Sequence, residues 1–301
     1  MHPEGRGGLT TLEVVHTVAW MKHLSRQARA EGRRVGFVPT MGALHEGHLS
    51  LVRAAQRECA PVVVSIFVNP LQFGPGEDYD RYPRTFEQDR MLLEQAGVEI
   101  LFAPTVEELY PPGFATTVTV GGHTERLEGR CRPGHFRGVA TVVTKLLLIV
   151  QPEVAYFGRK DAQQARLVQQ LVRDLHLDTE IVVCPIVREP DGLACSSRNR
   201  YLQGEERRAA TVLYRALDAV RERFEAGERN AGRLREQLLA VLASEPRARL
   251  DYAEIVDAES FEPVPVVTGP ALVLLAVWIG STRLIDNLEI ARRDGRLVAV
   301  L

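Results

Sequence analysis

Two histidines, His45 and His48, form an H-x-G-H motif at a point where a short apolar run gives way to an amphipathic one. The apolar run predicts a buried strand ending at Pro39, and the amphipathic run predicts a helix beginning near Gly47. A helix N-terminus exposes unpaired N–H groups and a partial positive charge, which favour a bound phosphate. Two imidazoles there can donate hydrogen bonds to phosphate oxygens, and a glycine lets the backbone come close. The alternative is that one histidine caps the helix and the other is a surface residue, but these features together favour phosphate binding.

A second segment with phosphate-binding chemistry is D-G-L-A-C-S-S-R-N, residues 191–199. Ser196 and Ser197 can donate hydrogen bonds through hydroxyl and backbone groups, and Arg198 can clamp a phosphate with two parallel hydrogen bonds. Loops of serine, arginine and asparagine are commonly no more than turns, so this pattern alone is weak. It gains weight because it follows an H-x-G-H motif in the same chain.

Lysine is rare in this chain, because only Lys22, Lys145 and Lys160 are lysines among 37 Lys and Arg residues. Lys160 lies in F-G-R-K-D, residues 157–161, between a predicted strand and a predicted helix. A lysine where arginine is the rule indicates a need for a compact ammonium group, so we predict that Lys160 binds phosphate. Lys145 lies among apolar residues and is predicted to reach out from a core-facing helix. Asp161 belongs either to the same site or to the N-cap of the following helix.

Two amides follow another predicted strand, in N-P-L-Q, residues 69–72. Asn69 and Gln72 each offer a donor and an acceptor without charge, which suits the recognition of a hydroxyl group. The alternative is an Asn-Pro turn with Gln72 in solvent. Basic residues also gather in the loop Arg130–Arg137, which is either an anion site or an ordinary solvated basic loop.

The composition excludes several classes of protein. Of 301 residues, 45% are hydrophobic and 25% charged, and the net charge of −2 offers no electrostatic footprint for nucleic acid or an anionic membrane. Four cysteines without a C-x-x-C pair argue against a zinc site or a disulfide framework and fit a reducing compartment. Met1–Gly5 lacks the apolar region of a signal peptide, and the apolar runs 139–150 and 271–280 are too short to span a bilayer. We therefore expect a cytoplasmic protein that acts on small molecules.

Strand and helix patterns alternate through the first two-thirds of the chain. Predicted strands cover 35–38, 61–68, 99–102, 154–157 and 179–183, and predicted helices cover 47–59, 85–96, 138–150 and 161–175. Such alternation is typical of an α/β fold with a doubly wound, largely parallel sheet. Ligands in these folds bind beyond the carboxyl ends of the strands, where the strand order reverses.

The pattern changes near residue 187. Predicted helices over 205–225 and 231–244 precede predicted strands over 250–256, 271–279 and 282–289. Clustered strands after clustered helices indicate a smaller α+β domain. We therefore predict two domains, a catalytic domain over 1–186 and a smaller C-terminal lid domain over 187–301.

The H-x-G-H motif resembles the signature of the nucleotidyltransferase superfamily, which includes class I aminoacyl-tRNA synthetases. Six segments together resemble one family in it, the pantothenate synthetases. They are P-T-M-G-A-L-H-E-G-H (39–48), S-I-F-V-N-P-L-Q-F (65–73), R-P-G-H-F-R-G-V (132–139), F-G-R-K-D-A-Q-Q (157–164), V-R-E-P-D-G-L-A-C-S-S-R-N-R-Y-L (187–202) and T-R-L-I-D-N (282–287). These segments run through the whole chain in the order found in the family.

The resemblance implies a Rossmann-like domain with a smaller C-terminal domain, in a homodimer. It implies that ATP, accompanied by Mg²⁺, drives the ligation of (R)-pantoate and β-alanine to pantothenate, with a pantoyl-adenylate as intermediate and AMP and pyrophosphate as products. The residues that it assigns to ATP are Met41, Gly42, Ala43, Leu44, His45, Glu46, Gly47, His48, Gly158, Arg159, Lys160, Asp161, Val187, Cys195, Ser196, Ser197 and Arg198.

The resemblance also implies roles for particular residues. His48 is the expected proton donor and His45 its partner, and the other catalytic groups are Lys160 and Arg198. The predicted substrate-binding residues are Gln72, Gln164 and Asn69, of which Gln72 also lies near β-alanine. Two positions depart from the family pattern: Arg159 replaces a residue that is commonly acidic or an amide, and Cys195 replaces a common methionine.

Three other interpretations compete with this one. A different H-x-G-H nucleotidyltransferase would attach a nucleotide to a phosphorylated substrate, whereas the uncharged Gln72 and Gln164 favour a hydroxylated carboxylic acid. A class I tRNA synthetase is disfavoured by the neutral net charge and by the lack of an anticodon-binding extension. A nucleotide-binding regulator would bind ATP without turnover. The sequence identifies no metal ligand beyond the bare acidic candidate Asp89.

Overall fold

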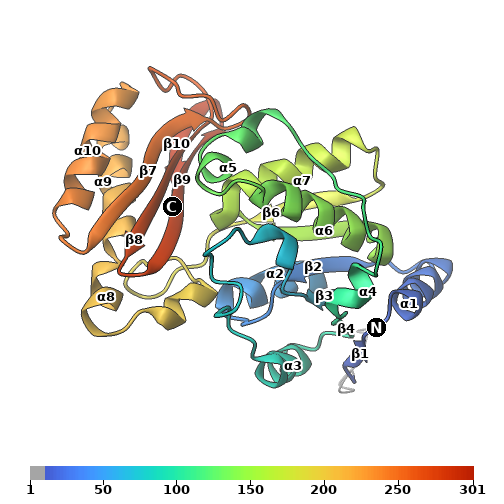
Figure 1. Ribbon diagram of the computed structural model, residues 1–301. Coiled ribbons are helices and arrows are strands. Elements are labelled where there is room, and N and C mark those ends of the chain that lie inside the picture. Colours follow the sequence, from blue (N-terminus) through green and yellow to red (C-terminus); the bar gives the residue numbers. More distant parts are fainter. Residues whose placement is uncertain (1–10) are drawn as a thin grey trace, which may run out of the picture. The chain divides into compact units, whose positions relative to one another are not determined.

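The computed structural model describes residues 11–301, and the stretch Met1–Gly5 considered above lies outside them. The chain forms two compact units, each with a sheet of its own (Figure 1). Unit 1 comprises residues up to 118 together with 137–157 and 171–184, and unit 2 comprises 119–136, 158–170 and 185–301. No helix within residues 11–301 is long and apolar enough to cross a membrane.

Unit 1 is built on a six-stranded sheet. Its strands are β1 (Glu13–Val15), β2 (Gly36–Thr40), β3 (Val62–Ile66), β4 (Ile100–Phe102), β5 (Val154–Gly158) and β6 (Glu180–Cys184). They lie in the order β1-β4-β3-β2-β5-β6, and the pairs from β1 through to β5 are parallel. The chain moves outwards from β2 to β4 and then returns to place β5 on the other side of β2. The strand order therefore reverses between β2 and β5, which is where doubly wound sheets bind ligands.

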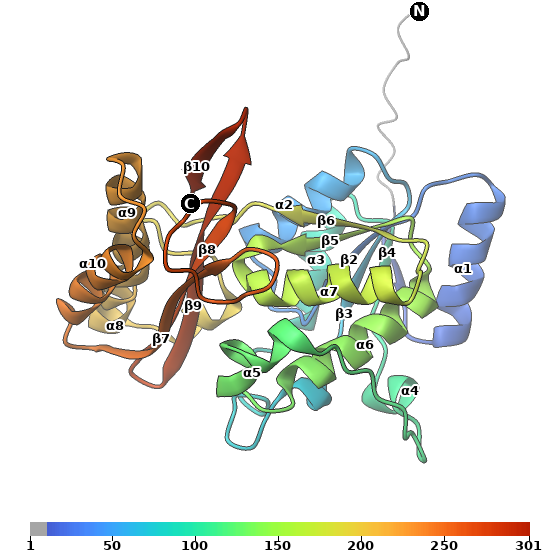
Figure 2. The same ribbon diagram turned by 90° about the horizontal axis from the view of Figure 1, so that it is seen from above.

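Helices cover both faces of this sheet. They are α1 (Val18–Ala30), α2 (Glu46–Gln56), α3 (Phe86–Gln95), the single turn α4 (Val106–Leu109) and α6 (His135–Val150). The helix α7 (Ala162–Asp174) begins in unit 2 and ends in unit 1. Val38 and Val64 pack with Leu51 of α2 and Leu93 of α3 on one face, and α6 lies on the other side of the strands (Figure 2). The central strands are apolar at successive positions because both of their faces are buried.

Unit 2 contains an antiparallel sheet with the order β10-β9-β8-β7. Its strands are β7 (Ala248–Asp257), β8 (Ala271–Ile279), β9 (Thr282–Arg293) and β10 (Arg296–Val300), and its helices are α5 (Glu128–Cys131), α8 (Gly204–Ala209), α9 (Val212–Glu225) and α10 (Ala231–Ala243). Leu217 of α9 and Leu238 of α10 pack onto one sheet face with Val273 and Leu288. This cluster forms the core of the unit.

The predicted α/β fold with a smaller α+β part is confirmed, with local differences. The helix predicted over 205–225 is broken into α8 and α9 at Ala210 and Thr211, and part of the Arg130–Arg137 loop is helical. The elements β1, α1 and β10 were not predicted. The domain boundary at 186/187 stays a prediction. Unit 2 includes the segments 119–136 and 158–170 in addition to 185–301.

Candidate active site

The turn between β2 and α2 is held by a buried carboxylate. Gly42 and Ala43 both have positive φ angles, 79° and 51°, and the two N–H groups that follow Gly42 point at Asp89 of α3. The Ala43 and Leu44 N–H groups each donate to a different Asp89 oxygen at 2.8 Å, and the Thr85 hydroxyl donates to the same carboxylate at 3.2 Å. Ala43 keeps a backbone conformation that costs an ordinary residue free energy because Asp89 fixes it from a neighbouring helix.

Gly42 is required in this turn. Its φ of 79° favours glycine, and a Cβ atom there would approach Ile66 Cγ2 to 3.0 Å and Asp89 Oδ2 to 3.1 Å. The Gly42 N–H donates to Thr40 Oγ1 at 3.0 Å, and that hydroxyl donates to the Ser65 carbonyl of β3 at 2.7 Å. The turn is thus fixed to two strands and one helix before the histidines begin.

His45 and His48 both cap α2. His45 is the N-cap residue, and its Nδ1 accepts from the Gly47 N–H at 3.1 Å. His48 Nδ1 accepts from the His45 N–H at 3.3 Å, and the two ring centroids lie 4.1 Å apart. Because Nδ1 of each neutral ring is an acceptor, the ring proton is on Nε2. The alternative considered above, one capping and one surface histidine, is wrong: both side chains cap the helix, and both residues are half-buried.

Asn69 and Gln72 form one hydrogen-bonded group in unit 1. Asn69 Nδ2 donates to Gln72 Oε1 at 3.0 Å and to the Gly138 carbonyl at 3.1 Å. Gln72 Nε2 donates to Met41 Sδ at 3.1 Å, which brings the amide to the first residue of the turn Met41–His48 that contains the H-x-G-H motif. Both amides are buried, so the alternative of an exposed Gln72 is wrong. Gly138 is needed for this packing, because a Cβ atom there would lie 2.1 Å from the Leu71 carbonyl oxygen.

Tyr110 fixes the orientation of Asn69, a contact that the sequence patterns did not predict. Its hydroxyl donates to Asn69 Oδ1 at 2.9 Å, and burial raises the pKa of Tyr110, so the phenol remains a donor. Lys145 Nζ lies 5.5 Å from the centre of the Tyr110 ring and 4.5 Å from that of Phe114, and burial lowers the pKa of this lysine. Lys145 therefore lies over aromatic faces, half-buried.

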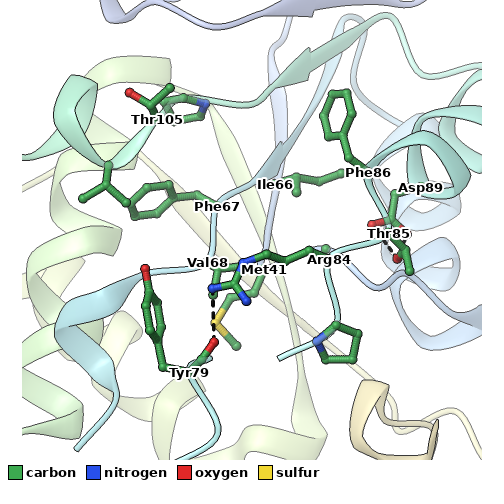
Figure 3. Close-up of a pocket in the computed structure, with 14 residues that line it drawn as sticks. Met41, Ile66, Phe67, Val68, Tyr79, Arg84, Thr85, Phe86, Asp89 and Thr105 are labelled. Atoms are coloured by element: carbon green, nitrogen blue, oxygen red, sulfur yellow. Dashed lines mark hydrogen bonds between the residues drawn. The ribbon is translucent and has the colours of Figure 1, made fainter. Parts of the chain in front are cut away.

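A cavity of about 280 Å³ lies beside the H-x-G-H turn (Figure 3). The carboxyl ends of β2, β3 and β4 and the segment 79–86 contribute its walls, with Met41, Ile66, Phe67, Tyr79, Arg84 and Thr105 among the lining residues. Arg84 donates to the carbonyls of Tyr79 at 3.1 Å and Tyr82 at 3.2 Å, so its charge is held at the wall. The position beyond the strand ends is where open α/β sheets bind small molecules.

The predicted residues around Lys160 lie in unit 2, in the short helix η3 (Arg159–Asp161) that follows β5. Lys160 Nζ lies 3.9 Å from Asp161 Oδ2, and Arg159 forms an ion pair with Glu289. Asp161 is the last residue of η3 and immediately precedes α7. Arg159, which departs from the family pattern, is therefore paired with Glu289 of the same unit.

The two glutamines that follow differ in role. Gln163 is buried, and its Nε2 donates to the carbonyls of His123 at 2.6 Å and Arg126 at 2.9 Å. Gln164, the predicted substrate ligand, is only half-buried. Gln163 thus holds the backbone of the segment 119–136, whereas Gln164 remains partly accessible.

The predicted phosphate loop at 195–198 also lies in unit 2. The Cys195 N–H donates to the Val187 carbonyl at 2.9 Å, which pairs these two predicted ATP residues. Ser196 caps the short helix η4 (Ser197–Tyr201), and its Oγ accepts from the Arg198 N–H at 3.3 Å. The serine–arginine segment is therefore an ordered helical turn.

One arginine of the basic loop Arg130–Arg137, Arg132, lies beside a buried acid, Glu128. Arg283 donates to both oxygens of Glu128 at 2.8 Å, and Arg132 Nη1 lies 3.8 Å from the same carboxylate. Arg132 Nη1 is also 3.1 Å from His135 Nε2. Burial alone would raise the pKa of Glu128, but the hydrogen bonds and charge of Arg283, aided by Arg132, outweigh it and lower that pKa. Arg132 thus has a structural partner, which the sequence did not decide.

The predicted site residues therefore fall into two groups. Unit 1 brings together the Met41–His48 turn with Asn69 and Gln72, and unit 2 holds Gly158–Asp161, Gln164, Val187 and Cys195–Arg198. Within residues 11–301 no group of three or more His, Cys, Asp or Glu side chains is placed to hold a metal ion.

A doubly wound sheet with an H-x-G-H turn at the strand beside its reversal point defines a Rossmann-like nucleotide-binding protein. The family follows from comparison with known proteins. The chain belongs to the pantoate-β-alanine ligase family, because the family model described as pantoate-beta-alanine ligase matches residues 13–289.

Individual relatives agree with this family over nearly the whole chain. A pantothenate synthetase of Caldicellulosiruptor saccharolyticus is 53% identical over 277 residues, which cover 92% of this chain and 99% of the relative. One from Roseiflexus sp. is 57% identical over 276 residues, or 92% of this chain and 98% of the relative.

Solved structures give the same result. A crystal structure of pantothenate synthetase from Thermus thermophilus superposes with a TM-score of 0.89 at 52% identity, covering 93% of this chain and all of that chain. A pantoate-β-alanine ligase from Francisella tularensis, complexed with beta-gamma ATP and beta-alanine, has a TM-score of 0.77 at 36% identity, covering 92% and 97%. The predicted fold and family are confirmed.

Proposed function

We propose that this chain joins (R)-pantoate to β-alanine in two steps that use ATP. The pantoate carboxylate attacks the α-phosphorus of ATP, pyrophosphate leaves, and pantoyl-adenylate forms. The β-alanine amine then attacks the acyl carbon, AMP leaves, and pantothenate is released. The observation that carries the proposal is the 3.1 Å contact of Gln72 Nε2 with Met41 Sδ. It supports binding of an uncharged hydroxylated part of the substrate directly beside the phosphate-binding turn.

The first step needs positive groups where charge develops. Negative charge grows on the phosphate oxygens in the transition state, and preorganised donors there are worth the most. His45 and His48 have Nδ1 occupied by backbone N–H groups, so each neutral ring would offer Nε2–H to an oxygen. His48 is the proposed proton donor and His45 its partner. The other proposed donors are Lys160, Ser196, Ser197 and Arg198.

Recognition of pantoate is assigned to Gln72, Gln164 and Asn69. Asn69 occupies Gln72 Oε1 and Met41 Sδ accepts one hydrogen of Gln72 Nε2, so it is the N–H₂ side of this amide that would meet the substrate. An N–H₂ group donates only, so we expect it to meet a hydroxyl or carboxylate oxygen of pantoate. The remaining residues proposed to hold ATP are Met41–Gly47, Gly158, Arg159, Asp161, Val187 and Cys195.

Magnesium is proposed to arrive with the substrate as MgATP. Mg²⁺ in such sites is usually held by one or two carboxylates together with substrate phosphates, so a dedicated protein cluster is not required. The homodimer and the cytoplasmic location are likewise proposals, supported by the family resemblance and the composition. Light scattering after size-exclusion chromatography would show a monomer mass if the dimer proposal is wrong.

The product tests the proposed reaction. Purified protein is incubated with ATP, Mg²⁺ and pantoate, with and without β-alanine, and AMP and pantothenate are measured by chromatography. We expect AMP to appear in step with pantothenate when all three substrates are present. A nucleotidylated product without AMP would favour another nucleotidyltransferase, and bound ATP without any product would favour a regulator.

A further inference from the structure

Two consecutive buried polar residues, Asp286 and Asn287, lie in the middle of β9. They are 2% and 1% exposed, in a sheet whose other buried positions are mainly apolar. Neighbouring residues of a strand point to opposite faces of the sheet. A buried carboxylate and a buried amide cost free energy unless they are paired, so their partners indicate what they are for.

Asn287 binds the backbone of the Lys160 segment. Its Nδ2 donates to the carbonyls of Arg159 and Lys160, both at 2.9 Å. Two residues further along the strand, Glu289 pairs with the Arg159 guanidinium. One face of β9 thus holds the backbone of η3 on both sides of the Lys160 Cα atom, which fixes the point from which the lysine side chain departs.

Asp286 binds the segment that leads to the serine–arginine turn. Its carboxylate accepts two hydrogen bonds from Arg188, at 2.7 and 3.1 Å. Arg188 also donates to the Gly192 carbonyl at 3.1 Å and forms a backbone bridge with Ala194. Residues 188–194 are therefore closed into a hairpin whose next residues are Cys195–Arg198. The strand β9 lies against both η3 and η4.

We infer that Asp286 and Asn287 are a positioning pair, which sets the Lys160 segment and the Cys195–Arg198 segment at the correct separation for one nucleotide. The inference rests on the proposed function, because it takes both segments to hold ATP. If Asp286 and Asn287 only stabilised the fold, a well-packed pair of apolar residues could often do so equally well. Here Asp286 Oδ1 also accepts from the Asn287 N–H at 2.8 Å, but the other side-chain hydrogen bonds of the two residues go to two separate loops.

The variants Asn287→Ala and Asn287→Ser test this inference. We expect the Kd for ATP to rise about tenfold, because two hydrogen bonds to the Lys160 segment are lost. We expect kcat/KM for ATP in pantoate-dependent ATP–pyrophosphate exchange to fall ~10²-fold, because a displacement of about 1 Å at a catalytic group has that effect. Asn287→Ser keeps a polar group and serves if the alanine variant does not fold. Wild-type Kd and exchange in a folded Asn287 variant would overturn the inference.

A double-mutant cycle distinguishes positioning from mere stability. If Asn287 acts through Lys160, then Asn287→Ala should cost less than about threefold in exchange when Lys160 is already alanine. If Asn287 only stabilises the sheet, the two losses should multiply, and that result would contradict the inference. Asp286→Asn weakens the ion pair with Arg188 and so affects the other segment. Its fold-loss in exchange should therefore multiply with the fold-loss of Lys160→Ala.

Ile290→Val is the matched control. Ile290 is fully buried on the same strand, in the apolar cluster of unit 2, and contacts neither loop through a hydrogen bond. We expect its Tm to fall while the Kd for ATP stays unchanged. ATP binding is measured without turnover, so it tests the positioning role separately from the proposed reaction. If wild-type protein binds ATP but shows no exchange, the proposed function is wrong. The Kd for ATP of the Asn287 variants would still decide the positioning role.

Discussion

At the scale of single residues, the groups proposed to contact phosphate are also held by the backbone around them. His45 and His48 accept backbone N–H groups through Nδ1, and Ser196 accepts the Arg198 N–H through its hydroxyl. Such caps remove rotamer freedom before a ligand arrives, so less conformational entropy is lost on binding. The same contacts make these residues look ordinary in a sequence, since capping and catalysis favour the same residue types.

The compositional argument about Lys160 makes a prediction at this scale. We expect Lys160→Ala to lose ~10²–10³-fold in turnover, the usual cost of removing one transition-state donor. Lys160→Arg should also lose much of its activity, because a forked guanidinium does not fit a site built for a compact ammonium group. Steady-state AMP release measures both variants. Lys22→Arg, outside the proposed site, is the control, and wild-type turnover in Lys160→Arg would mean that the rare lysine carries no information.

Tyr110 gives a second prediction for a single hydroxyl. Tyr110→Phe removes one of the two donors to Asn69 Oδ1 and leaves only the Leu71 N–H, so the Asn69 amide, and through it Gln72, is held less firmly. We expect KM for pantoate to rise about fivefold, the equivalent of one hydrogen bond of about 1 kcal/mol, with KM for ATP unchanged. Tyr156→Phe is the matched control, because that buried hydroxyl donates to Glu58 at 2.7 Å. Equal changes in both KM values would argue against an effect through Gln72.

At the scale of elements, the sheet and the H-x-G-H helix could be predicted because their causes are local. Apolar runs of strand length and a glycine turn lie in the sequence itself. Two elements were missed although signals were present: Thr17 caps α1 through its side chain, and Asp294-Gly295, both with positive φ, forms the turn before β10. By contrast, Asp89 and Asn287 act on segments far away in the sequence. Spacing and composition do not reveal such contacts, because they exist only after packing.

The Glu128–Arg283 pair predicts how the stability of unit 2 depends on pH. The pKa of Glu128 in the folded protein lies below its ordinary value of 4.5. Its stabilising effect is therefore present above pH 4.5 and is lost as the pH falls through the folded-state value. We expect Glu128→Gln to lower the free energy of unfolding by about 3 kcal/mol at pH 7, since it breaks a buried pair. The difference from wild type should shrink below pH 4.5.

Urea denaturation at pH 7 and pH 4 measures this difference. Glu262→Gln is the control, because Glu262 is an exposed partner of Arg126 and such pairs contribute about 0–1 kcal/mol. A Glu128→Gln variant whose deficit stays constant between the two pH values would show that the carboxylate charge does not contribute to stability.

At the scale of the whole molecule, the chain crosses between its two units several times. The segments 119–136 and 158–170 belong to unit 2, although they precede the predicted boundary at 186/187. They supply partners to residues of the C-terminal sheet: Glu128 for Arg283, and the Lys160 carbonyl for Asn287. The sequence pattern shows where strands and helices change in kind, but it does not show which earlier segments return to complete a later core.

The fragment 187–301 tests the predicted domain boundary. Expressed alone, it would leave Arg283 with Asp251 but without Glu128, and the Asn287 amide without its two carbonyls. Buried polar groups that lose their partners are costly. We therefore expect a fragment with helical far-UV circular dichroism but without cooperative urea unfolding. The full chain is the reference, and a cooperative transition in the fragment would instead establish 187–301 as an independently folding domain.

The hairpin of β8 and β9 has a consequence for the accuracy of folding. Ile279 pairs with Thr282, so a loop of only two residues, Gly280 and Ser281, sets the register in which β9 lies. A slip of one residue would move every β9 side chain to the opposite face of the sheet. Asp286 would then face the Lys160 segment and Asn287 the Arg188 side. A carboxylate would meet two carbonyl oxygens, and an arginine would lose its counter-charge. The two segments proposed to hold ATP therefore select the register of this hairpin, because only the correct register satisfies the hydrogen bonds and charges of both.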